Sequence, residues 1–217
     1  MGLPRRRWLI ALFVTVTAVC VLVLFLKIGD WLFVADTLPP RLDVVFTFAG
    51  ENTRITYSRE LMERFPAARW VLSDYLHQYS RILSRDGFDM SRVAAMDTSP
   101  STYSEVKGLA DWLTSCRAGL PRSSGTRDSS SLQKIPVTPR DGRLHIALVS
   151  NPFHMRRIKF MVGDVFHDQT LCFHYLPVPV ERYGWTREAV HCWWKSKRLR
   201  NWVGSEIGKL LLYWLFS

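Results

Sequence analysis

The stretch Asp43-Val-Val-Phe-Thr-Phe-Ala-Gly50 is a short, almost continuous run of apolar residues that ends at a glycine. Such a run is typical of a β-strand buried on both faces, as in a parallel sheet covered by helices. A helical pattern follows it at 56–65, and a second short strand follows that helix at 70–73. Parallel pairing of the two strands through a right-handed crossover is therefore predicted.

The same alternation of strand and helix continues along the chain. Apolar patterns predict helices at 75–85, 104–116 and 153–163, and strands at 93–96, 144–150 and 172–176. We therefore predict an α/β domain at 42–217, a three-layer sandwich around a mainly parallel sheet. The segment at about 117–143 is rich in Ser, Gly and Arg, and its low apolar content predicts a mobile surface insertion.

The N-terminal region has the pattern of a membrane anchor. The run 8–26 holds 19 residues without a charged side chain, enough for a helix of about 28 Å, close to the thickness of a bilayer core. This predicts a basic cytoplasmic stretch at 1–7, a transmembrane helix at 8–27 and a linker at 28–41. Three arginines precede the run, so the positive-inside bias places the domain outside the cytoplasm. A cleaved signal peptide is the alternative, although no small-residue cleavage site follows.

Composition and charge exclude several classes of protein. The chain has 217 residues and a net charge of +10, and its 47% apolar content excludes global disorder. The basic excess is concentrated in the N-terminal flank, the insertion and the C-terminal region, which favours a membrane surface over nucleic acid as a partner. Four cysteines are too few for a disulfide scaffold. Outside the anchor, Cys116, Cys172 and Cys192 allow at most one disulfide, and Cys172 is predicted to be an ordinary core residue of its strand.

The C-terminal region combines tryptophan with basic residues. Four of its tryptophans are interleaved with lysine and arginine, and the segment 210–216 is wholly apolar. Two interpretations follow from this pattern. The region is either a closing helix whose aromatic face packs on the sheet, or a helix that lies in a membrane interface.

Polar residues follow each predicted strand, and the carboxyl ends of parallel strands meet at one edge of a sheet, where ligands bind. Candidate ligand-binding residues at these ends are Gly50, Glu51, Asn52, Arg54, Ser73, Asp74, Ser99, Thr102, Ser150, Asn151 and Arg157. Arg54, His154 and Arg157 suit an anion, and two helix N-termini at the same edge favour negative charge. We predict a phosphate or carboxylate ligand. His154 is the candidate general acid or base, with Glu105 orienting it or taking its place.

Each of these features also has a simpler interpretation. The segment 99–105 fits a helix N-cap, with Glu105 in the first turn. Glu51 and Asp74 fit either a Mg²⁺ site or ion pairs with Arg54, and no metal site is predicted. The sequence has no G-x-S-x-G motif that would supply a nucleophile. It also has no G-x-G-x-x-G after the first strand, which argues against a nicotinamide-dependent dehydrogenase.

Four segments resemble the YdcF/SanA/ElyC-like domain of bacterial envelope proteins. They are Asp43–Gly50 with Arg54-Ile-Thr-Tyr-Ser-Arg-Glu-Leu61, Trp70-Val-Leu-Ser73, Ser99-Pro-Ser-Thr-Tyr-Ser-Glu105, and Leu148-Val-Ser-Asn-Pro-Phe-His-Met-Arg-Arg157. The last is the most specific, since it is similar to the family's L-V-T-S-x-x-H-M-x-R segment. The resemblance extends over roughly residues 42–216 and includes Glu206.

The resemblance implies a Rossmann-like fold, an N-terminal membrane anchor and a role in cell-envelope or peptidoglycan-precursor metabolism. It also implies S-adenosylmethionine or a nucleotide as a possible cofactor, or the handling of a lipid-carrier phosphate. The chain departs from the family in its glycines: Gly50 is the one that remains of two or three, and Asp74 stands where glycine is usual. Ser101 and Ser104-Glu105 replace an asparagine and a Glu-Asn pair.

Three functions are consistent with these features. The preferred one is an envelope factor, anchored in the bacterial inner membrane with a periplasmic domain, that binds a phosphorylated lipid, cell-wall precursor or nucleotide-like molecule. The second is a phosphoester hydrolase or transferase that uses His154 as acid or base. The third is a non-catalytic scaffold that binds partners through the tryptophan-rich C-terminal helix.

Overall fold

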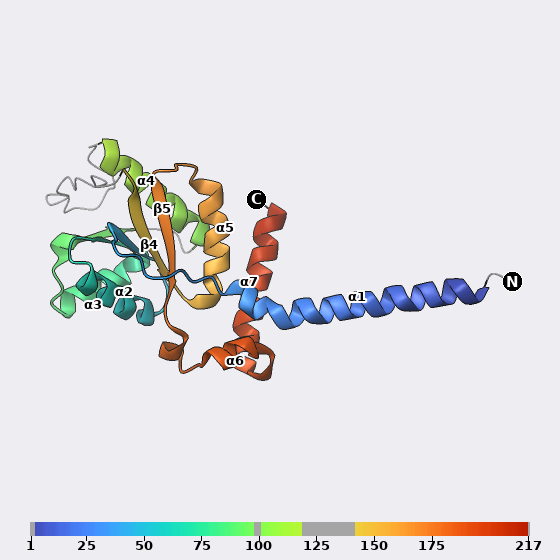
Figure 1. The fold of residues 1–217 in the computed structure, drawn as a ribbon. Helices are drawn as coiled ribbons and strands as arrows, with labels where there is room; N and C mark the ends of the chain where they lie inside the picture. Colours follow the sequence, from blue (N-terminus) through green and yellow to red (C-terminus); the bar gives the residue numbers. More distant parts are fainter. Residues whose placement is uncertain (1–2, 98–100, 119–141, 217) are drawn as a thin grey trace.

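The computed structural model describes residues 3–97, 101–118 and 142–216, and within them it has a single parallel sheet (Figure 1). Its strands are β1 (Val44–Thr47), β2 (Arg69–Ser73), β3 (Val93–Met96), β4 (Leu144–Ser150) and β5 (Leu171–Pro177). The order across the sheet is β3-β2-β1-β4-β5, and all four pairings are parallel. The predicted α/β class and strand positions are confirmed, and the sheet is wholly rather than mainly parallel.

Helices cover both faces of the sheet, which gives the predicted three layers. They are α1 (Leu3–Leu32), α2 (Asn52–Arg64), α3 (Gln78–Arg85), α4 (Thr102–Ala118), α5 (Met155–Val165), α6 (Arg187–His191) and α7 (Lys197–Phe216). One hydrophobic core packs α2, α3 and the start of α7 on one face, and the other packs α4 and α5 on the opposite face. β1 is the middle strand of the sheet. The side chain of Val45 points into the first core, and those of Val44 and Phe46 point into the second.

Short 3₁₀ turns connect several of these elements, and one of them breaks a predicted helix. The turns are η1 (Tyr75–His77), η2 (Met90–Arg92), η3 (Pro152–His154), η4 (Val180–Tyr183) and η5 (Trp193–Lys195). The helix predicted at 75–85 is split after η1, where Leu76 (φ 58°) and His77 (φ 54°) are left-handed. The cause is Asp74, whose carboxylate accepts hydrogen bonds from the first amides of α3, at Tyr79 and Ser80.

A buried polar cluster explains the threonine within the apolar strand β1. Thr47, Ser58 and Trp70 are fully buried. The Thr47 and Ser58 hydroxyls are 2.6 Å apart, and the Trp70 indole N–H donates to Thr47 Oγ1 at 2.8 Å. These bonds satisfy the three groups and link β1 to α2 and β2.

The N-terminal helix α1 is one long helix that extends away from the domain, and its last turns pack on the domain (Figure 1). The helix continues to Leu32, five residues beyond the predicted boundary at residue 27. Leu32 is fully buried, and the ring of Phe25 lies 4.8 Å from that of Trp193 in η5. Gly29 permits this approach, since a Cβ at that position would lie 2.5 Å from Trp193 Cδ1.

The rest of the predicted linker at 28–41 is also held against the domain. Val34 is buried in the second core. The Asp36 amide donates to Tyr175 O at 2.8 Å, and the Tyr175 amide donates back to Asp36 Oδ2 at 2.8 Å. Arg156 Nε donates to Trp31 O at 2.7 Å. The segment therefore forms part of the folded unit, because its backbone pairs beside β5.

The first part of the C-terminal region packs as a closing helix, and contact of its last turns with a membrane stays a prediction. Trp185 and Trp202 pack edge to face at 5.0 Å within the first core, as expected for a closing helix. The end of α7 is exposed, with Trp214, Leu215 and Phe216 each more than 70% accessible. Apart from its ends, the insertion predicted at about 117–143 lies outside the described residues.

Candidate functional site

A pocket of about 530 Å³ opens at the carboxyl edge of the sheet, between the ends of β1, β2 and β4 and the start of α4. Nine of the predicted site residues line it: Gly50, Arg54, Ser73, Asp74, Thr102, Glu105, Asn151, His154 and Arg157. Most of the candidate residues that follow the predicted strands therefore lie together. This is the position that parallel α/β sheets use for ligands.

Four predicted residues do not contribute to the described lining. Glu51 and Asn52 are exposed at the start of α2, outside the pocket. Ser150 is fully buried within β4, and its hydroxyl has no hydrogen-bond partner among the described residues. Ser99 lies outside the described residues. Of the two carboxylates considered for Mg²⁺, Asp74 lines the pocket and Glu51 does not.

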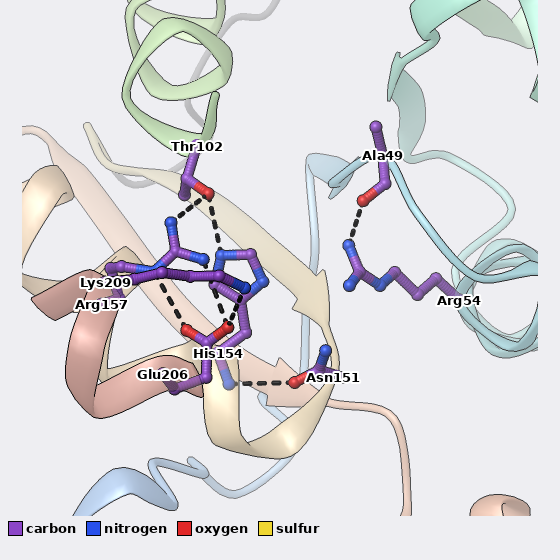
Figure 2. A network of polar contacts seen from close by, with 8 residues as sticks. All are labelled: Ala49, Arg54, Thr102, Asn151, His154, Arg157, Glu206 and Lys209. Atoms are coloured by element: carbon purple, nitrogen blue, oxygen red, sulfur yellow. Dashed lines mark hydrogen bonds and ion pairs between the residues drawn. The ribbon is translucent and has the colours of Figure 1, made fainter. Parts of the chain in front are cut away.

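A continuous polar chain crosses the pocket wall from α7 to η3 (Figure 2). Glu206 Oε1 accepts from Lys209 Nζ at 2.9 Å, and Glu206 Oε2 accepts from Arg157 Nε at 3.0 Å. Arg157 Nη1 donates to Thr102 Oγ1 at 2.7 Å, and Thr102 Oγ1 lies 2.9 Å from His154 Nε2. Residues from four elements are thus connected, and all except Lys209 are buried.

The hydrogen bonds of this polar network favour a neutral His154. Burial lowers the pKa of His154 well below its ordinary value, and Arg157, Arg54 and Lys209 lower it further. Arginine only donates hydrogen bonds, so Thr102 Oγ1 accepts from Arg157 and its own proton is available for His154 Nε2. His154 then carries its proton on Nδ1. A neutral imidazole at pH 7 fits the role of a base or hydrogen-bond acceptor better than that of an acid.

The lowered pKa of His154 predicts a pH dependence of stability. The unfolded chain takes up its proton near the ordinary pKa of 6.5, whereas the folded chain does not. The stabilisation is therefore complete above about pH 6.5 and decreases as the pH falls below it. Thermal unfolding from pH 7.5 to 5.5 should show a falling midpoint, and His154→Gln should make that fall shallower. Equal slopes for the two proteins would contradict this assignment.

Glu105 has a different role from the one predicted. Its Oε1 accepts the Ala49 amide at 2.7 Å, and its carboxyl group also bonds the Ser73 side chain. None of its hydrogen bonds reaches His154, whose ring is held by Thr102 instead. Burial raises the pKa of Glu105, while the bonds to Ser73 and Ala49 lower it. Glu105 therefore fixes the turn after β1, and the predicted pairing with His154 is wrong.

Arg54 faces the pocket without a carboxylate partner. It is 4% exposed, and its Nη1 donates to the backbone oxygens of Phe48, at 3.3 Å, and of Ala49 (Figure 2). Its Nε has no hydrogen-bond partner, and no described acidic group lies within ion-pair distance. The predicted alternative, an ion pair with Glu51 or Asp74, is not formed. A buried guanidinium in this state is costly unless a further acceptor completes it.

Gly50 makes the position of Arg54 possible. Its φ is +140°, a value that side-chain-bearing residues rarely adopt. A Cβ on Gly50 would lie 2.9 Å from Arg54 Cζ. The remaining glycine of this turn therefore provides room for the guanidinium over the backbone.

The described lining holds three cations, Arg54, Arg157 and Lys209, and three carboxylates, Asp74, Glu105 and Glu206, and Arg54 is the cation that makes no ion-pair contact with a described carboxylate. Glu206 is shared by two cations, Arg157 and Lys209. Both carboxylate oxygens of Asp74 accept backbone amides of α3. The N-terminus of α4 also contributes Ser101, Thr102 and Tyr103 to the lining, and its dipole favours negative charge. Together these groups would accommodate an anion beside Arg54.

Sequence reasoning missed part of the wall. The missed residues are Ala49, Gln78, Tyr79, Ser101, Tyr103, Met161, Glu206 and Lys209, of which Glu206 entered only through the family resemblance. Tyr79 is buried, and its hydroxyl lies 3.4 Å from Phe48 O and from Glu51 O. Most of these residues lie on helices rather than directly after strands. The one usable signal for Lys209 was its spacing of three from Glu206 on a helix.

Comparison of the chain with protein-family models, with curated proteins and with solved structures finds no match.

Proposed function

We propose that this chain is a membrane-anchored protein that binds a phosphorylated ligand in the pocket at the carboxyl edge of its sheet. The observation that carries the proposal is Arg54, a buried cation that lines the pocket and makes no ion pair with a described carboxylate. A phosphate group offers several acceptor oxygens and a negative charge, which suit a guanidinium and a helix N-terminus together.

The topology supports a Rossmann-like assignment of the domain. In the order β3-β2-β1-β4-β5, the chain moves outward from β1 in both directions. The pocket lies where the loops after β1 and β4 separate, which is the switch point that such folds use for ligands. We also propose kinship with the YdcF-like family, on the segments that carry the resemblance.

The anchor supports a ligand that comes from the membrane. Within the described residues, one helix is long and apolar enough to cross a bilayer, over Arg7–Leu32, and its most apolar stretch is exposed. The first part of α7 lies beside the base of this helix, and α7 then runs away from it to its exposed apolar end (Figure 1). Lys209 and Glu206 of α7 also line the pocket. A lipid phosphate at the headgroup level would therefore reach the pocket along α7, and we propose a lipid-carrier phosphate or lipid-linked cell-wall precursor as the ligand.

The proposed setting follows from the charges that flank the anchor. Three arginines precede the apolar run, which favours a cytoplasmic N-terminus and a periplasmic domain in the bacterial inner membrane. Nucleic acid is not proposed as a partner.

The turn after β1 argues against a nucleotide or S-adenosylmethionine. Sites for such molecules bring phosphates or a ribose close to the backbone of a glycine-rich turn. Here Arg54 covers Gly50 and fills that space. We therefore propose neither molecule as the ligand.

Native mass spectrometry of the full-length protein in detergent tests the proposal. A polyprenyl phosphate is titrated, and the corresponding polyprenol is used as the uncharged control ligand. We expect the phosphate to bind and the polyprenol not to bind. Arg54→Met should lower the affinity for the phosphate by at least about tenfold, since a hydrogen bond to a charged group contributes about 1.5–3 kcal/mol.

Arg59→Met is the matched control for this experiment. Arg59 lies on the same helix as Arg54, bonds Asp86 at 3.0 Å and does not line the pocket. Its substitution should leave the affinity unchanged. Equal binding of the polyprenol, or full affinity in Arg54→Met, would overturn the proposal.

A phosphoester hydrolase or transferase is the second candidate. In this candidate, Nε2 of the neutral His154, which accepts from Thr102, would exchange that partner for a substrate hydroxyl or a water molecule. This candidate requires turnover of a phosphoester that His154→Gln abolishes while binding persists.

A further inference from the structure

Two histidines and a cysteine converge at the opposite end of the sheet from the pocket. His145 lies near the start of β4, and Cys172 and His174 lie near the start of β5. His145 Nδ1 is 3.0 Å from His174 Nε2, and the possible ligand atoms of all three lie within 4.8 Å of one another. The three side chains are partly buried, so the cluster is shielded and still reachable from solvent.

The strand register places the three side chains on one face. His145 is paired with Cys172, and Ala147 with His174, in the parallel ladder between β4 and β5. Paired residues point to the same side of a sheet, and so do residues two apart on one strand. The donors therefore come from rigid, hydrogen-bonded strands rather than from loops, which is how precise metal sites are built.

The geometry is close to that of a tetrahedral metal site. Zinc takes imidazole nitrogen at about 2.0–2.1 Å and thiolate sulfur at about 2.3 Å, so ligand atoms in a tetrahedral site lie roughly 3.3–3.6 Å apart. The two nitrogens, at 3.0 Å, are in hydrogen-bond contact, and the three ligand atoms lie up to 4.8 Å apart, so the side chains must rotate to surround one ion. The two rings are also almost parallel, with centroids 5.3 Å apart and planes at 11°.

Neighbouring groups favour a cation. The Asp36 carboxylate accepts the Tyr175 amide at 2.8 Å, one residue beyond His174, and it makes no ion pair among the described residues. Asp43 Oδ2 accepts the amide of His145 at 2.9 Å and fixes that end of β4, while the charge of Asp43 is paired with Arg41 at 2.8 Å. Cys172 is a free thiol, and the described cysteines form no disulfide, so the bond that the sequence left undecided is absent.

We propose that His145, Cys172 and His174 bind one Zn²⁺ ion, with a fourth position open to water. Two nitrogens and one sulfur form a borderline-soft donor set that zinc accepts readily and that magnesium or calcium does not. A hydrogen-bonded histidine pair, the simpler interpretation, needs neither the thiol nor a metal. The zinc site is separate from the pocket and does not depend on the function proposed for it.

Isothermal titration calorimetry with Zn²⁺ and the metal-stripped full-length protein in detergent tests this inference. We expect one equivalent to bind, and we expect Cys172→Ser and His174→Ala each to lower the affinity by at least about tenfold. Co²⁺ serves as a spectroscopic probe. It should give a thiolate-to-cobalt absorption band and tetrahedral d–d bands that disappear in Cys172→Ser.

Cys192→Ser is the matched control, since Cys192 is also a partly buried free thiol but lies outside the cluster. It should bind zinc as the unchanged protein does. Circular dichroism of each variant without metal verifies that it is folded. Absence of stoichiometric zinc binding, or equal affinity in a folded Cys172→Ser, would overturn the proposed site. A cobalt spectrum without a thiolate band would do the same.

Discussion

Glu206→Ala is expected to lower the free energy of unfolding by about 3–5 kcal/mol, the usual cost of removing one partner of a buried ion pair. The Glu206 carboxylate is only 6% exposed and accepts from Arg157 at 3.0 and 3.4 Å and from Lys209 at 2.9 Å. Without it, the guanidinium of Arg157 stays buried with only Thr102 as a partner. Urea unfolding of the full-length protein in detergent measures the change.

Lys209→Met provides the control for this prediction. The Lys209 side chain is 51% exposed, so its pairing with Glu206 should contribute less than about 1 kcal/mol. The double variant Arg157→Met, Glu206→Leu should recover part of the lost stability, because apolar groups of similar size often replace a buried pair without loss. A small effect of Glu206→Ala, similar to that of Lys209→Met, would show that the pair does not hold α7 on α5.

Gly50→Ala is expected to reduce both stability and ligand binding. Its φ of +140° should cost an alanine about 1–3 kcal/mol of backbone strain. The new Cβ would lie 2.9 Å from Arg54 Cζ and 3.0 Å from each terminal nitrogen, so the guanidinium must move. We expect the affinity for polyprenyl phosphate to fall by at least about tenfold, because the displaced Arg54 guanidinium can no longer donate to the phosphate in the pocket.

Gly184→Ala separates these two effects. Gly184 has a φ of +73°, and nothing lies within 4 Å of the position of its Cβ. The substitution should therefore destabilise the protein through strain alone and leave phosphate binding unchanged. If Gly50→Ala binds the phosphate with full affinity, Arg54 does not need its observed position to hold the ligand.

The strands could be predicted from the sequence because the apolar runs of a doubly covered sheet are short and distinctive. The run 43–50 and the run 144–150 both became central strands. The break at Leu76 and His77 could not be predicted, because it depends on the Asp74 carboxylate reaching amides that are five and six residues away. The extension of the first helix to Leu32 was also missed, since its cause is packing against Trp193, far away in the sequence.

The candidate site could be predicted where its residues directly follow strands, as Gly50, Arg54 and His154 show. Contacts made from helix faces, such as those of Lys209 and Tyr79, depend on how the helices pack. The sequence contains no clear pattern that predicts them. The partner of His154 was wrongly predicted because Glu105 and Thr102 lie one turn apart at the start of α4. The cluster of His145, Cys172 and His174 depends on the register between two strands, which the sequence alone does not specify.

The close contact between Gly29 and Trp193 has a consequence for how this protein would meet its ligand. A domain joined to its anchor by a flexible tether samples a hemisphere of positions above the membrane. Here the last turns of α1 are locked to the domain by Trp193 and by the bond from Arg156 to Trp31 O. If α1 spans the bilayer as proposed, the pocket stays at a fixed distance from the membrane surface and in a fixed orientation relative to it. Encounters then become a two-dimensional search, limited by lateral diffusion in the plane of the lipid.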